Sequence, residues 1–247
     1  MKNPEGKWFG SRPTTPDEKT ALVEQVFEGV AGNYDLMNDL MSLGIHRLWK
    51  NRFVQKLRPR AGKCILDLAG GTGDIADRMA KRGAQVTVCD MSHNMLEEGK
   101  RNRGAFDRVI LNWVQGNAEC LPFADGSFDA VAISFGLRNV ARIDDALAEI
   151  RRVLKVGGRF CCLEFSTPQD ETWRALYDAY SDAVIPALGE IVAHDRASYE
   201  YLVESIRKFP DARALSKRLC NAGFSAVVHE TLTGGVVAIH SGWRTTA

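Results

Sequence analysis

The sequence predicts an α/β fold built on one mostly parallel sheet, followed by a C-terminal antiparallel hairpin. Between residues 64 and 165, short apolar runs alternate regularly with helical segments. This alternation is typical of βαβ crossovers, in which helices cover both faces of a parallel sheet. At 247 residues and 45% hydrophobic, the chain can bury one substantial core and little else. Near the end, Thr233-Gly234-Gly235 separates two more strand-like runs, as a tight hairpin turn would.

The expected elements follow one another along a single domain. Residues 1–16 are rich in proline and predict a flexible arm, and residues 17–60 carry apolar residues at helical spacing and predict a helical lid. The alternating segments are Cys64–Leu68 and Asp74–Arg82, Gln85–Asp90 and Ser92–Arg103, Val109–Gln115 and a loop, Phe128–Phe135 and Ile143–Leu154, and Arg159–Phe165. Residues 170–222 predict mainly helix, with interruptions at Pro186 and Pro210, and the last strands are expected at Phe224–Thr231 and Val236–Ser241. The domain is thus expected to span residues 17–247.

Composition disfavours several classes of function. With 32 basic and 31 acidic residues the net charge is +1, so no global field favours nucleic acid. The six cysteines form no C-x-x-C pair and are expected as reduced core residues, and no metal site is expected. No apolar run reaches the roughly 18 residues of a spanning helix, and the first fifteen residues lack the apolar stretch of a secretory signal. We therefore expect a cytoplasmic protein.

Acidic residues and glycines at the ends of the first two strands predict a nucleotide-type site. Asp67 lies near the end of the first strand, and Gly71 and Gly73 follow at the turn into a helix. Glycines at such a turn let the backbone approach a ligand, and open α/β sheets bind ligands at the carboxyl ends of their strands. Asp90 ends the next strand, where its carboxylate can accept both hydrogen bonds of a ribose diol. The pattern predicts a ligand with an adenosine moiety.

Two adenosine ligands compete for this site. Residues 71–76 also satisfy the Gly-x-Gly-x-x-Ala pattern of dinucleotide sites, so the motif alone does not exclude NAD. Asp67 before the glycines and Asp74 after them would repel a diphosphate, but they suit the sulfonium and ammonium groups of S-adenosylmethionine. The charges therefore favour S-adenosylmethionine as the cofactor.

A third loop, after the run that ends at Gln115, extends the predicted site. In this loop Asn117 offers a polar side chain for an adenine edge, and the small Ala118 stands beside it. The alternative is a plain connecting loop, although loops in such folds commonly carry function.

Long motifs outside the glycine turn are specific for one family. The motifs are Tyr34-Asp35-Leu36-Met37-Asn38-Asp39-Leu40-Met41-Ser42-Leu43-Gly44-Ile45-His46-Arg47-Leu48-Trp49, then Ile133-Ser134-Phe135-Gly136-Leu137-Arg138-Asn139-Val140, and Arg152-Val153-Leu154-Lys155-Val156-Gly157-Gly158-Arg159-Phe160-Cys161-Cys162-Leu163-Glu164-Phe165-Ser166. With them the chain resembles the ubiquinone/menaquinone biosynthesis C-methyltransferases over nearly its whole length, from Val26 to Trp243. The resemblance implies a class I, Rossmann-like methyltransferase fold with a seven-stranded sheet. It also implies transfer of a methyl group from S-adenosylmethionine to a ring carbon of a polyprenylated benzoquinol or naphthoquinol.

The resemblance also assigns expected contacts. The family's cofactor contacts fall on Thr72, Asp90, Asn117, Ala118 and Ser134. One departure from the general methyltransferase glycine pattern is Ala69 in place of the first glycine, which this family shares, and Val156 stands where proline is commoner. The helical insert at residues 170–210, with His194, Asp195, Tyr199 and Tyr201, is expected to wall the quinol pocket and its prenyl channel.

The chemistry of methyl transfer suggests four further residues, three on the acceptor side and one beside the sulfonium. Once deprotonated, a phenolic oxygen pushes electron density onto the neighbouring ring carbon, so the protein should stabilise that oxygen or take its proton. Arg138 and Asn139, just beyond the fourth strand, are candidates for this role, with a salt bridge to the following helix as the alternative for Arg138. His46 is a candidate base, against a structural role, and Tyr34 can close over the sulfonium or simply pack.

Surface contacts and rival functions stay open at this stage. The basic amphipathic segment 45–60 fits a lid helix on the core, or a peripheral contact with the inner face of a membrane, where a lipophilic quinol and other quinone-biosynthesis enzymes would be met. The rival functions are a methyltransferase with another acceptor, a cofactor-binding protein without catalysis, and an NAD-linked reductase.

Overall fold

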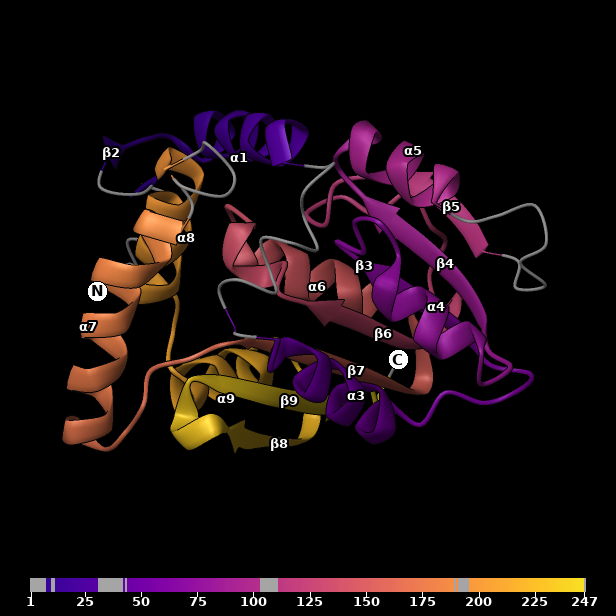
Figure 1. Ribbon diagram of the computed structural model, residues 1–247. Coiled ribbons are helices and arrows are strands. Elements are labelled where there is room, and N and C mark those ends of the chain that lie inside the picture. Colours follow the sequence, from indigo (N-terminus) through magenta and orange to yellow (C-terminus); the bar gives the residue numbers. More distant parts are fainter. Residues whose placement is uncertain are drawn as a thin grey trace.

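The computed structural model describes residues 8–9, 12–30, 42, 44–102, 111–188, 190 and 196–246. In this part of the chain one seven-stranded sheet has the order β5-β4-β3-β6-β7-β9-β8, with helices on both faces (Figure 1). Strands β3 to β7 pair in parallel, and β9 pairs antiparallel with β7 and with β8. The strands are β3 Cys64–Leu68, β4 Gln85–Asp90, β5 Leu111–Gln115, β6 Phe128–Ser134, β7 Leu154–Phe165, β8 Ser225–Leu232 and β9 Val237–Trp243. The predicted sheet and its final hairpin are confirmed.

Helices connect the strands in the alternating order that the sequence predicts. They are α1 Pro16–Val30, α3 His46–Leu57, α4 Asp74–Ala80, α5 His93–Arg101, η2 Leu137–Asn139, α6 Ile143–Val153, α7 Glu171–Leu188, α8 Arg196–Lys208, α9 Ala212–Asn221 and η4 Thr233–Gly235. The chain runs outward from β3 through β4 to β5 and then crosses back to β6 on the other side of β3. This reversal of strand order is the place where open α/β sheets bind their ligands.

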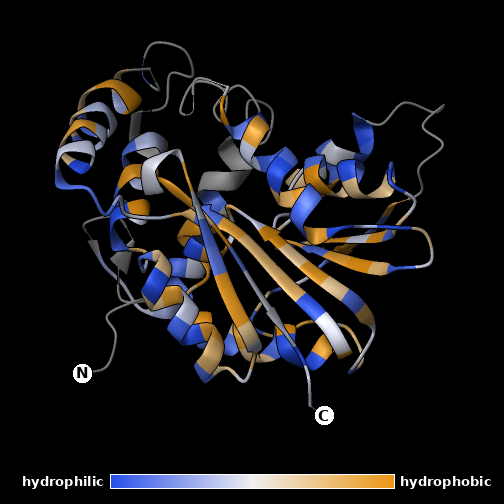
Figure 2. Cartoon of the chain, turned by 90° about the horizontal axis from the view of Figure 1, so that it is seen from below, coloured by the Kyte–Doolittle hydropathy of each residue, from blue (hydrophilic) through white to orange (hydrophobic). Residues whose placement is uncertain are grey.

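The core consists of two apolar layers, one on each face of the sheet. Neighbouring residues of a strand face opposite layers: Ile65 packs in one and Leu66 in the other, and Cys161 and Cys162 divide in the same way. Helices α3 and α4 cover one face, and α6 and α9 cover the other (Figure 1). The central strands are accordingly hydrophobic along much of their length (Figure 2).

The N-terminal arm, the helix around Pro186 and the exposure of the cysteines differ from the sequence prediction. Within the arm expected at residues 1–16, Trp8–Phe9 pairs with Arg12–Pro13 in a short antiparallel ribbon, and α1 already begins at Pro16. Pro186 does not interrupt the helix: it lies inside α7, two residues before the helix ends at Leu188, where only the last turn is affected. All six cysteines are free, but Cys120 and Cys220 are exposed, so not all of them are core residues.

Among the described residues, no helix is both long enough and apolar enough to cross a bilayer.

Candidate functional site

A cavity lies at the carboxyl ends of the central strands. Its volume is about 760 Å³ including the open mouth. The lining comes from the ends of β3, β4, β5 and β6 and from two helices that cover them, α1 with Thr20 and Val23 and α5 with Met95. The strand-end residues in the lining are Leu68, Ala69, Gly71, Asp90, Met91, Ser92, Gly116, Asn117, Ala118, Glu119, Phe135, Gly136, Asn139, Val140 and Ala141. Gly71, Asp90, Asn117, Ala118 and Asn139, all predicted from the sequence, therefore meet in one cavity.

The turn after β3 forms the floor of this cavity. Gly71 has φ +54° and Gly73 has φ +83°, backbone conformations that glycine adopts without steric cost. Below the turn, the Asp67 carboxylate is buried, and its Oδ2 atom has no hydrogen-bond partner among the described residues. Burial raises the pKa of Asp67 to about 8, against a backbone hydrogen bond from Ala76 that lowers it. Such a group favours a positive charge nearby.

Asp90 is held in place at the end of β4. Its Oδ2 accepts a hydrogen bond from Gly71 N at 2.8 Å, and its Oδ1 accepts one from Ser92 N at 2.9 Å. Burial raises the pKa of Asp90, and these backbone hydrogen bonds oppose that effect by stabilising the charged form. The carboxylate is thus oriented within the cavity wall, as a ribose diol requires.

The loop after β5 is fixed by its own contacts and by α6. Asn117 Oδ1 accepts a hydrogen bond from Glu119 N at 2.9 Å, which fixes the orientation of the side-chain amide in the cavity lining. Glu119 Oε1 accepts hydrogen bonds from Ala141 N at 3.1 Å and Arg142 N at 2.9 Å, which joins this loop to the segment after β6.

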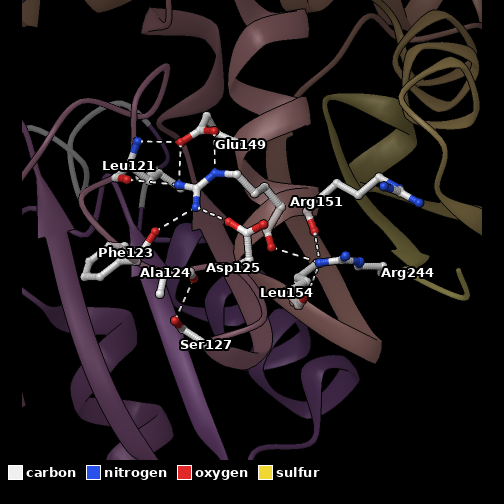
Figure 3. Close-up of polar contacts among 10 residues, drawn as sticks. Leu121, Phe123, Ala124, Asp125, Ser127, Glu149, Arg151, Leu154 and Arg244 are labelled. Atoms are coloured by element: carbon white, nitrogen blue, oxygen red, sulfur yellow. Dashed lines mark hydrogen bonds and ion pairs between the residues drawn. The ribbon is translucent and has the colours of Figure 1, made fainter. Parts of the chain in front are cut away.

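Arg152, on α6, holds the following part of the same loop. Its guanidinium binds the carbonyl oxygens of Leu121 at 3.0 Å and Phe123 at 2.8 Å. The same group contacts the carboxylates of Glu149 and Asp125, both at 2.7 Å (Figure 3). The loop that carries Asn117 and Ala118 is therefore anchored on a helix of the core.

The end of β6 and the η2 turn form the remaining wall. Asn139 lines the cavity, and its Oδ1 accepts a hydrogen bond from Tyr201 Oη, on α8, at 3.1 Å. This contact brings one residue of the predicted substrate insert to the cavity wall. Ser134 Oγ is buried without a hydrogen-bond partner among the described residues. Ser134 is not among the residues that line the cavity.

Arg138 points away from the cavity lining into a buried ion pair. Its Nη1 lies 2.9 Å from Oε1 of Glu164 on β7 and also donates to the carbonyl oxygen of Phe135. Its backbone N–H donates to the other Glu164 oxygen at 3.2 Å, and its guanidinium stacks over the Phe165 ring, 5.3 Å from the centroid. A salt bridge does form, but with a strand rather than with the following helix. The Nε atom of Arg138 is buried and has no partner among the described residues.

The charge argument needs one correction at Asp74. Its carboxylate is paired with Lys50 at 2.9 Å and with Arg78 at 2.8 Å. Burial alone would raise the pKa of Asp74, but these two cations bring it below its usual value. Asp74 is therefore compensated by two cations, and among Asp67, Asp74 and Asp90 it is Asp90 that lines the cavity.

Other predicted residues lie away from the cavity lining. Thr72 and Gly73 belong to the turn after β3, and Gly73 is packed against the Trp113 ring. His46 is buried on the face of α3 that also carries Trp49 and Lys50. Tyr34 lies outside the described residues, as do His194 and Asp195 of the insert.

Sequence reasoning missed two charged residues next to the cavity. Lys19 of α1 binds the carbonyl oxygens of Arg138 and Val140, and Glu164 of β7 binds the Arg138 guanidinium. Both contacts join segments that are distant along the chain, and no local pattern marks them. The only signal for Glu164 was its place as a charged residue within an apolar strand.

Comparison with known proteins agrees with this geometry. The model of the ubiE/COQ5 methyltransferase family matches residues 14–244. The chain belongs to this family. It is 53% identical to the ubiquinone/menaquinone biosynthesis C-methyltransferase UbiE of Paracoccus denitrificans, over 98% of each chain. It is 49% identical to the mitochondrial 2-methoxy-6-polyprenyl-1,4-benzoquinol methylase of Oryza sativa, over 96% of this chain and 87% of that one.

Solved structures of other methyltransferases share the fold at low identity. The methyltransferase bound to the Trm112 activator of Haloferax volcanii superposes with a TM-score of 0.65 at 17% identity, over 89% of this chain and 98% of that one. Phosphoethanolamine N-methyltransferase 2 of Haemonchus contortus, in complex with S-adenosyl-L-methionine, gives 0.61 at 14%, over 80% of this chain and 52% of that one. The predicted Rossmann-like methyltransferase fold and its S-adenosylmethionine cofactor are confirmed.

Proposed function

We propose that this protein transfers a methyl group from S-adenosylmethionine to a ring carbon of a polyprenylated benzoquinol or naphthoquinol. The observation that carries the proposal is the cavity that joins Asp90, Asn117 and Asn139, in a chain of the ubiE/COQ5 family. The reaction consumes donor and quinol and yields S-adenosylhomocysteine, the C-methylated quinol and one proton.

The residues around the cavity fit the donor. Asp90 accepts hydrogen bonds from the ribose hydroxyls, and Asn117, Ala118 and Met91 surround the adenine. The buried Asp67 carboxylate favours the positively charged end. When bound, the donor supplies an activated methyl group on a sulfonium, and the protein aligns the acceptor and excludes water.

The acceptor meets the cavity at the η2 turn. We assign Asn139, on the cavity wall, to the phenolic oxygen, and Arg138 to electrostatic stabilisation of the oxyanion from behind that wall. Burial raises the pKa of Tyr201 and of Tyr177, and the positive charge of Arg138 opposes this effect on both phenols, while Glu164 adds to it on Tyr201. A quinol oxygen nearer to the guanidinium than to Glu164 would ionise more easily for the same reason. His46 is a second candidate for the proton, and Tyr34, Thr72, Ser134 and Gly73 are further proposed donor contacts.

The direct test uses purified protein, isotopically methyl-labelled donor and two prenylated quinols, one with a benzene ring and one with a naphthalene ring. We expect one labelled methyl on a ring carbon of at least one quinol, and none on a panel of phenols and amines. Arg138→Ala should retain donor binding and lose most turnover. If neither quinol gains a methyl group while the donor binds normally, the proposed reaction is wrong.

A peripheral membrane contact is a further part of this proposal. The buried face of α3 carries Trp49, Phe53 and Leu57 and packs in the core, so only the exposed side of the helix, with Arg47 and Leu48, can face a lipid surface. We propose that this side meets anionic lipid, where the lipophilic acceptor and other quinone-biosynthesis enzymes are found. Flotation with anionic liposomes should carry the protein upward, and Leu48→Ser should reduce that fraction.

A further inference from the structure

A buried lysine joins the helix over the cavity to the acceptor side of the site. Lys19 lies on α1 and is only 7% exposed. Its Nζ atom is 3.3 Å from the carbonyl oxygen of Arg138 and 3.1 Å from that of Val140. These two carbonyl groups flank Asn139 in the chain, and Asn139 lines the cavity. One ammonium group therefore holds the backbone on both sides of Asn139.

The start of α1 is fixed so that Lys19 faces inward. Thr15 and Glu18 form a reciprocal capping box: Thr15 N donates to Glu18 Oε2 at 2.8 Å, and Glu18 N donates to Thr15 Oγ1 at 3.2 Å. In addition, Asp17 pairs with Arg142 at 2.7 Å. The helix is thereby fastened at its first turn, and its next residues, Thr20 and Val23, cover the cavity.

The charges around Lys19 argue against a role in stability alone. Burial lowers its pKa to about 8, and the nearby Glu119 opposes that effect. Glu119 itself is occupied by Arg142 and by two backbone N–H groups of the same segment. Burying an ammonium group that binds only neutral carbonyl groups costs desolvation free energy. What the contact provides in return is a fixed geometry of the backbone segment that it binds.

We infer that Lys19 is a positioning residue for methyl transfer. Lys19 completes the wall around Asn139 only when α1 lies over the cavity. The role rests on the proposed methyl transfer. Asn139 is held from a second direction by Tyr201 Oη. With Lys19 and Tyr201 both in place, the Asn139 amide group that faces the acceptor is held in one position. The placement of α1 over the donor is thereby coupled to the position of Asn139 on the acceptor side.

The first test compares Lys19→Met with Lys100→Met, which removes an exposed lysine of α5 that pairs with Glu97. Lys19→Met keeps the length of the side chain and removes its donors. We expect kcat at saturating donor to fall ~10- to 100-fold, as for displacement of a positioned group, while the control keeps the wild-type value. If Lys19 only fastens α1, the donor binds less tightly but kcat at saturation is unchanged, and the inference is overturned.

A double-mutant cycle tests whether Lys19 acts through Asn139. Tyr201→Phe removes the other anchor and keeps the ring. If both anchors position Asn139, the fold reduction of kcat in the double variant is smaller than the product of the fold reductions in the two single variants. Independent, multiplicative losses would overturn the inference.

Hydrogen exchange provides a readout that needs no activity. The amides of residues 138–142 are bonded to Glu164, Gly136, Leu137 and Glu119. In Lys19→Met they should exchange faster than in the wild type and in Lys100→Met. Unchanged exchange there would contradict the inference even if the quinol reaction itself fails. Should Lys19→Met not fold, Lys19→Arg keeps the charge, displaces the donors and is expected to show the same changes in weaker form.

Discussion

Asp67 is placed to sense the charge of the bound donor. Its carboxylate lies beneath the glycine turn, and Gly70 leaves no room for a Cβ atom between them, since such an atom would stand 3.0 Å from Asp67 Oδ2. With a pKa of about 8, the group is mostly protonated at neutral pH before the donor binds. A cationic ligand lowers that pKa and drives a proton off.

We therefore predict that donor binding releases protons at pH 7 and becomes tighter as the pH rises toward 8. Asp67→Asn should abolish the release, because an amide has no proton to lose in this range. Calorimetry in two buffers of different ionisation enthalpy measures the number of protons. Asp77→Asn on α4 is the control, and equal proton release from all three proteins would assign the proton to another group.

A second pair of residues explains how the chain accommodates alanine in its glycine turn. Ala69 has φ +50°, a left-handed conformation, and its methyl group lies against Gly136 of the η2 turn. A Cβ atom at Gly136 would stand 2.5 Å from the Ala69 Cβ atom. The sequence shows the Ala69 departure, but its partner 67 positions away becomes visible only in the fold.

Gly136→Ala is expected to lower the free energy of unfolding by about 1–3 kcal/mol, the usual cost of overpacking a close contact. Ala69→Gly in the same chain should restore it, because it removes the opposing methyl group and relieves the positive φ. Chemical denaturation of the two single variants and the double variant measures the effect. A double variant as unstable as Gly136→Ala would exclude this contact as the cause.

At the scale of elements, alternation predicted the layered sheet well because strands buried on both faces read as uninterrupted apolar runs. The bounds of β3 and β4 agree with the sequence prediction. Strand β7 begins at Leu154 rather than Arg159, because Leu154 already pairs with Phe128 ahead of the apolar run. Likewise, the hairpin at Trp8–Phe9 depends on backbone hydrogen bonds that composition does not report.

Helix α6 supports the donor site without lining the cavity. Substitution of Arg152 can therefore separate an effect on donor binding from an effect on kcat. Arg152→Met removes the contacts with Leu121, Phe123 and Asp125, so the loop that carries Asn117 is freed on one side. We expect weaker donor binding with kcat at saturating donor close to the wild-type value. Titration calorimetry and steady-state kinetics separate the two effects. Arg101→Met removes an exposed arginine of α5 as the control, and a loss confined to kcat would contradict the assignment.

At the scale of the whole molecule, the site depends on contacts that no sequence pattern contains. Motifs located the residues at the ends of β3, β4, β5 and β6, since each motif lies within one strand and its turn. The Lys19 and Glu164 contacts could not be located in this way, because a buried charge is favourable only beside partners that the fold brings to it. The same reasoning applies to Arg138, whose partner lies on a strand rather than on the adjacent helix.

His240 gives the folded protein a predictable response to acid. It is buried in β9, and its Nε2 atom lies 2.9 Å from the carbonyl oxygen of Ala212 at the start of α9. Burial lowers its pKa from 6.5 to about 4, against that hydrogen bond. Between these pH values the folded protein holds fewer protons on His240 than the unfolded chain does, so the free energy of unfolding falls as the pH is lowered.

His240→Gln should remove that slope, because glutamine can still donate a hydrogen bond to Ala212 but does not titrate. The effect on the free energy of unfolding is at most about 3 kcal/mol between pH 6.5 and 4. Asp67 acts in the opposite direction: its raised pKa makes the folded protein lose stability as the pH rises from 4 toward 8. Between pH 4 and 6.5 these two contributions have opposite slopes and offset each other in the wild type. Denaturant unfolding from pH 4 to 9 should therefore show a free energy of unfolding that falls with rising pH from 4 to 8 in His240→Gln, and one that rises with pH between 4 and 6.5 in Asp67→Asn. His93→Gln, at an exposed position of α5, should reproduce the wild-type profile, and a His240→Gln profile equal to that of the wild type would place the titrating group elsewhere.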